Sequence, residues 1–108
     1  MIIKHFPLQQ QYMLGHLLKG SDKVMDGAWF DILGMVEAKL TLSGMAPGDQ
    51  VEIFGANTVD VPTAEQKIPL FKPFTKSCEI NIKKCRWIRA EHTEASGSLV
   101  TVDFLGSN

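Results

Sequence analysis

The sequence predicts an all-β protein, an antiparallel β-sandwich of about seven to eight strands that is Ig-like or jelly-roll-like. Short runs alternate apolar and polar residues, as in Val36–Leu42 and Leu99–Leu105. A period of two places successive side chains on opposite faces of a strand, so each run indicates a strand that is half buried. Gly, Pro, Asn and Ser turns separate these runs, which is typical of a sandwich of short strands.

The alternating runs set the order of the expected strands. In chain order they cover residues 28–33, 36–43, 50–55, 79–83, 86–93 and 98–105. A turn signal, Ala46-Pro47-Gly48-Asp49, lies between the second and third of these runs, because Pro sets φ and Gly follows it. It predicts that these two strands form an antiparallel pair. Ala95-Ser96-Gly97-Ser98 predicts a second tight connection, between the last two strands.

The first residues differ from the rest, because their apolar residues are dense but do not alternate cleanly. We expect residues 1–27 to form an N-terminal arm or edge segment packed on the domain or on a neighbouring subunit. Gly15 and Gly20 weaken a helix there, so the segment is expected to be extended, with one short helical turn near residues 8–14. Residues 28–108 are expected to form the sandwich domain. The interface candidates in the arm are Phe6, Leu8, Tyr12 and Leu14.

Composition excludes several classes of function. The 108 residues carry a net charge of -1, so no basic field is present to hold a phosphate backbone, and we expect no nucleic-acid partner. No apolar run approaches the roughly 20 residues of a membrane span, and the N-terminus lacks the apolar core of a signal peptide. We therefore expect no membrane partner and a product made in the cytoplasm. Cys78 and Cys85 are expected to be reduced, with a cross-strand disulfide as the alternative.

Catalytic and metal-binding signatures are absent from the sequence. His5, His16 and His92 have no metal-ligand spacing, and no nucleophile elbow or phosphate-binding loop occurs. We therefore expect no catalytic residue, no metal, no cofactor and no enzymatic activity. His92 is expected to be partly buried and hydrogen-bonded. The carboxylates expected on solvated strand faces and in turns are Glu37, Asp49, Glu52, Asp60 and Glu65.

The run Arg86-Trp87-Ile88-Arg89 has two interpretations. Alternation places Trp87 and Arg89 on one face of a strand, so the stem of Arg89 can pack on the indole and cover the sheet. Alternatively, Arg86, Trp87 and Arg89 contact a ligand, because Trp and Arg are frequent in binding hot spots. We favour the packing role.

The segment Ile68-Pro69-Leu70-Phe71-Lys72-Pro73-Phe74 places large apolar residues between prolines. The prolines lack a ladder donor, so the segment is predicted to be an edge or a loop. It either folds back over an open end of the sandwich or docks on another chain. We favour subunit contact, since exposed apolar patches mark interfaces. The interface candidates here are Ile68, Leu70, Phe71 and Phe74.

Gly44, Val51–Asn57, Arg86–Ala90 and Ser98–Gly106 together resemble small β-sandwich structural proteins of tailed bacteriophages. The resemblance covers residues 28–106 and leaves the first 27 residues outside. It implies a capsid decoration (cement) subunit or a head-tail or tail accessory subunit, acting by assembly and without a cofactor. A place in the virion, and contacts with other virion structural proteins, follow as expectations.

The sequence leaves two alternative functions open. The first is a non-enzymatic, homo-oligomeric virion subunit, with a trimer favoured because closed symmetry is usual. The alternative is a binding module that recognises a host glycan or protein through Trp87 and its neighbours.

Overall fold

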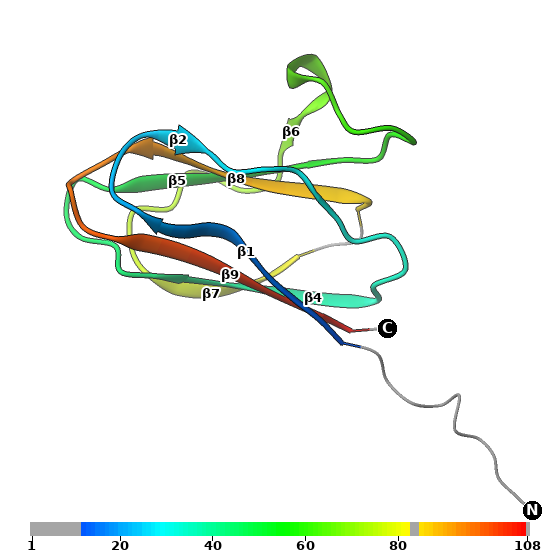
Figure 1. Cartoon of the computed structure of the whole chain (residues 1–108), viewed down its shortest axis with the longest axis horizontal. Helices are drawn as coiled ribbons and strands as arrows, with labels where there is room; N and C mark the ends of the chain where they lie inside the picture. Colours follow the sequence, from blue (N-terminus) through cyan, green and yellow to red (C-terminus); the bar gives the residue numbers. More distant parts are fainter. Residues whose placement is uncertain (1–11, 83–84, 108) are drawn as a thin grey trace, which may run out of the picture.

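The computed structural model describes residues 12–82 and 85–107. Two antiparallel sheets pack face to face (Figure 1), which confirms the predicted all-β sandwich. The strands are β1 (Tyr12–Ser21), β2 (Met25–Asp26), β3 (Phe30–Asp31), β4 (Glu37–Ser43), β5 (Gln50–Ala56), β6 (Ile68–Pro69), β7 (Cys78–Ile82), β8 (Trp87–Glu94) and β9 (Val100–Ser107). A short 3-10 helix spans Ala64–Gln66. Among the described residues, no helix has the length and apolar character of a membrane span.

The first sheet has the strand order β1-β9-β4-β7. The second has the order β2-β8-β5-β6, and β3 also pairs with β8. Strands β2, β3 and β6 have two residues each, so the sandwich rests on the six longer strands. The strand predicted at residues 28–33 is observed only as the two-residue strand β3.

The core lies between the two sheets and is formed by the inward residues of the alternating runs. Leu40 and Leu42 of β4 lie in one buried cluster with Val51 and Ile53 of β5. Phe104 of β9 is 1% exposed and belongs to the same cluster. Burial of these side chains supplies the main driving force for folding, at about 25 cal/mol per Å² of apolar surface.

The predicted pairing of residues 36–43 with residues 50–55 is wrong. Strand β4 pairs with β7 and β9, whereas β5 pairs with β8 and β6. The turn at Ala46–Asp49 thus connects the two sheets rather than closing a hairpin. Both strands bury one face in the same core, and opposite sheets satisfy that requirement as well as neighbouring strands do, across a gap of about 10 Å.

The segment for which an arm or edge strand was expected contains β1, which pairs with β9 at the edge of the first sheet. Tyr12–Leu14 are extended, so the expected helical turn is wrong over these residues. Leu17 and Leu18 are both buried, because the register shifts between His16 and Leu18. Phe6 and Leu8 lie outside the described residues.

Candidate interaction surfaces

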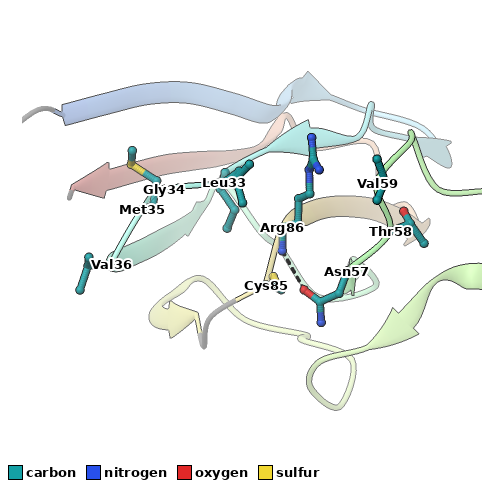
Figure 2. A pocket seen from close by; sticks show the side chains of 10 residues that line it. Leu33, Gly34, Met35, Val36, Asn57, Thr58, Val59, Cys85 and Arg86 are labelled. Atoms are coloured by element: carbon teal, nitrogen blue, oxygen red, sulfur yellow. Dashed lines mark hydrogen bonds between the residues drawn. The ribbon is translucent and has the colours of Figure 1, made fainter.

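An apolar pocket of about 570 Å³ opens at one end of the sandwich. Its walls come from residues 32–36, which precede β4, from residues 57–59, which follow β5, and from the residues before β8 (Figure 2). The side chains of Leu33, Val36 and Val59 are exposed around it. Sequence reasoning missed this pocket, because its walls come from three segments that lie far apart in the sequence.

Arg86 holds two of the pocket's walls together. Its backbone N–H donates to the side-chain oxygen of Asn57 at 3.0 Å (Figure 2). Its backbone carbonyl accepts a hydrogen bond of 2.7 Å from the N–H of Ile32. The guanidinium lies 3.4 Å from a carboxylate oxygen of Asp31 and above the ring of Trp87. Arg86 therefore has a structural role at this end of the sandwich.

Trp87 is only 8% exposed. Its indole N–H donates to the backbone carbonyl of Thr58 at 2.9 Å. A buried Trp whose N–H is satisfied by the protein's own backbone offers little surface to a ligand. These contacts attach β8 to the loop that follows β5.

The guanidinium of Arg89 is held by residues other than Trp87. Its guanidinium lies over the ring of Trp29, at 5.6 Å, and also contacts Asp26 at 2.8 Å and Glu91 at 3.2 Å. The pairing of β3 with β8, with Phe30 opposite Ile88, brings the residue just before β3 into the neighbourhood of Arg89. The cross-strand neighbour is closer than the residue two positions along the same strand.

The apolar segment Ile68–Phe74 lies along its own domain. Phe74 donates to the carbonyl of Val51 at 2.8 Å and accepts from its N–H at 2.9 Å. The rings of Phe71 and Phe74 lie 5.6 Å apart, and both side chains pack against the core. Of the two alternatives, folding back on the domain describes what these two aromatic side chains do in this structure.

The start of the same segment extends the second sheet. Ile68 and Pro69 pair with Gly55 and Phe54 of β5, so the proline lies in a short edge strand, as its missing N–H predicts. Leu70 packs against the core and lies close over Gly55, whose missing side chain makes room for it. Ile68 is 57% exposed and is the interface candidate of this segment that faces solvent most.

A second apolar surface lies on the outer face of the first sheet, where β1 begins. Leu14 of β1 pairs with Leu105 of β9, and the two side chains are 75% and 38% exposed. Tyr12, two residues before Leu14, is also exposed. Alternation places Tyr12 and Leu14 on the same face, so three large apolar side chains gather at this point.

Asp49 lies in the connection between β4 and β5 and is buried. The prediction that it lies in a solvated turn is therefore wrong. Its carboxylate accepts hydrogen bonds from the N–H of Ala46, from the N–H and hydroxyl of Ser96, and from the hydroxyl of Ser98. The hydrogen bond from Ser98, joined by those from Ala46 and Ser96, holds the pKa of Asp49 far below its ordinary value. The carboxylate therefore ties the β4–β5 connection to the β8–β9 connection.

His92 connects this cluster to β1. Its Nε2 lies 3.0 Å from a carboxylate oxygen of Asp49, and its Nδ1 lies 2.9 Å from the hydroxyl of Ser21. The prediction that His92 is hydrogen-bonded is confirmed, and its burial is complete. Ser21, His92 and Asp49 are all buried, and their hydrogen bonds join β1 and β8 to the β4–β5 connection. These buried contacts stabilise the sandwich.

Cys78 and Cys85 are free thiols in the structure, because they lie at β7 in one sheet and just before β8 in the other. Burial raises the pKa of both thiols, which makes them poor nucleophiles at neutral pH. Within residues 12–82 and 85–107, no group of three metal-ligating side chains comes together.

Comparison with known proteins shows a likeness to a solved structure. No protein-family model and no curated protein sequence matches the chain. The crystal structure of the SPBc2 prophage-derived protein YomS is similar, with a TM-score of 0.68 and 13% sequence identity. The match covers 93% of this chain and 96% of that one. At this identity the likeness shows a shared fold, which extends over nearly the whole of both chains.

Proposed function

We propose that the chain is a non-enzymatic structural subunit of a tailed-phage virion that works by homo-oligomeric contact, as a capsid decoration or head/tail accessory protein. The observation that carries the proposal is the fold shared with a prophage-derived protein over almost the full length of both chains. The source of that protein agrees with the phage resemblance found in the sequence.

The exposed apolar surfaces support an assembly role. Leu14 and Leu105 lie together on the first sheet, and Leu33, Val36 and Val59 surround the end pocket. Contiguous apolar surface of this kind usually marks a site of protein contact. The alternative, a module that binds a glycan or protein through Trp87, has less support because that side chain is buried against Thr58.

The composition of purified particles tests the proposal. Phage particles are induced from the host that encodes the chain, banded on a density gradient and quantified by mass spectrometry against the major capsid protein. A virion subunit is expected in the particle band at a fixed copy number per particle. The proposal fails if the chain is expressed but stays in the particle-free fractions.

A further inference from the structure

The end pocket presents apolar side chains to solvent. Leu33, Val36 and Val59 line it and are 64%, 69% and 78% exposed. Its volume of about 570 Å³ falls in the range of typical binding pockets. Covering apolar surface of this kind with an apolar partner lowers the free energy. The pocket is therefore suited to receive large apolar side chains.

The first residues of the chain join the fold beside this pocket. Tyr12, at the start of β1, pairs with Ser107 of β9. The backbone carbonyl of Ser107 accepts a hydrogen bond of 2.8 Å from the N–H of Val36, which lines the pocket. The start of β1 and the start of β4 lie at the same end of the sandwich (Figure 1). Residues 1–11, which are outside the described residues, are thus attached at the end where the pocket opens.

The sequence of this N-terminal segment matches the pocket in polarity and in charge. Its large apolar side chains within residues 2–8 are Ile2, Ile3, Phe6 and Leu8. Residues 1–11 include Lys4 and no acidic residue. Glu37 and Asp60 are exposed and directly follow two residues that line the pocket. An apolar segment that carries a lysine is therefore complementary to an apolar pocket bordered by carboxylates.

The linker to β1 favours the pocket of a neighbouring copy. Three glutamines, residues 9–11, separate Leu8 from β1, and the four steps from Tyr12 to Leu8 span up to about 13 Å. At Tyr12 the strand points out of its sheet, so a segment that enters the pocket of its own chain must turn sharply just before it. Glutamine is not among the residues that favour tight turns. A second copy is therefore the better partner.

We infer that the apolar side chains of residues 2–8 bind in the end pocket of a second copy of this chain. The inference rests on the proposed function for the need to self-associate, and it names the contact. The segment of one copy and the pocket of the next are different surfaces, so the contact is heterologous and a closed ring is the expected assembly. Phe6 and Leu8, two interface candidates from the sequence, thereby gain a binding site.

Crosslinking between two differently substituted chains tests the contact. A chain with Phe6→Cys is coexpressed with a chain with Val59→Cys, because Val59 is the most exposed apolar residue that lines the pocket. After treatment with a short bis-maleimide, peptide mapping by mass spectrometry is expected to find the two introduced cysteines joined. Leu99→Cys replaces Val59→Cys in the control. Leu99 is exposed in the β8–β9 connection, at the opposite end of the sandwich, so no crosslink to it is expected.

Paired charge substitutions provide the second test. Phe6→Asp adds a carboxylate to the segment, and Val59→Asp adds one to the pocket. Each is expected to weaken self-association by about tenfold or more in sedimentation velocity, because burying an unpaired carboxylate is costly. Gln10→Asp and Val61→Asp are the matched controls, the second at an exposed valine two residues beyond the pocket wall. Both are expected to associate as the wild type does, and far-UV circular dichroism shows that each variant folds.

Two results would overturn the inference. The first is that Phe6→Cys and Val59→Cys do not crosslink while Phe6→Asp and Val59→Asp associate as the wild type does. The second is that a chain carrying both cysteine substitutions crosslinks only within single chains, which would place the segment in its own pocket. The particle assay decides the proposed function separately: a chain that crosslinks between copies but stays out of the particles keeps this contact and loses the virion role.

Discussion

We predict that Trp87 stabilises the fold rather than contacting a ligand. The free energy of unfolding of the variant Trp87→Ala tests this prediction. The side chain is 8% exposed and its N–H donates to Thr58. Truncating a buried aromatic side chain of this size costs about 3–5 kcal/mol. Small domains are stable by only about 5–15 kcal/mol, so the variant is expected to be marginal.

The assay is equilibrium unfolding in urea, followed by circular dichroism. We expect a large decrease in the midpoint with an unchanged slope, because the folded and unfolded surfaces stay nearly the same. Trp87→Phe is the matched control: it keeps an apolar ring, loses the donor to Thr58, and is expected to cost about 1–2 kcal/mol. A cost below about 1 kcal/mol for Trp87→Ala would show that the indole contributes little to the fold, and the ligand-binding interpretation would regain its support.

Three further outcomes follow from the connections and the loop. Asp49 has a lowered pKa in the folded protein, so its contribution to stability is complete above the unfolded carboxyl pKa of about 3.9 and is lost as the pH falls below it. Asp49→Asn should therefore flatten the decrease of the urea midpoint between neutral and acidic pH. Gly44→Ala is expected to destabilise far more than Gly97→Ala in thermal melts. Both glycines have positive φ, but a Cβ at Gly44 would lie 2.0 Å from the carbonyl oxygen of Leu99, and one at Gly97 meets nothing within 4 Å. Phe74→Ser is expected to lower the melting temperature of the isolated chain, because the side chain packs on its own core; an unchanged melting temperature would return the segment to the role of a subunit contact.

Strand positions were predictable from the sequence, whereas strand pairing was not. Alternation predicted β4, β5, β8 and β9 to within about two residues at each end, since burial of one face leaves a visible period of two. The same pattern says nothing about which sheet a strand joins. The Pro47-Gly48 turn is typical of a hairpin, yet the chain crosses there from one sheet to the other.

The N-terminal strand was hard to recognise because its alternation is broken. Leu17 and Leu18 are adjacent and both buried, which a regular strand does not allow. The register shifts on either side of Leu18 explain this, and a bulge leaves no clear signature in a single sequence.

The burial of the polar cluster around Asp49 could not be predicted from residue type. Asp49 follows Pro and Gly and had the sequence context of a solvated turn. Its burial depends on donors from Ser96 and Ser98, which lie 47 and 49 residues later. Such long-range hydrogen bonding leaves no local pattern, so only the structure reveals that this carboxylate connects the two sheets at one end.

The solution mass of the unmodified chain, measured by light scattering after size exclusion over a wide range of concentrations, tests the central claim most directly. An assembly subunit is expected to run as a discrete oligomer, with a mass that is a fixed multiple of the monomer mass. A monomer at every concentration would contradict self-association as the basis of its function.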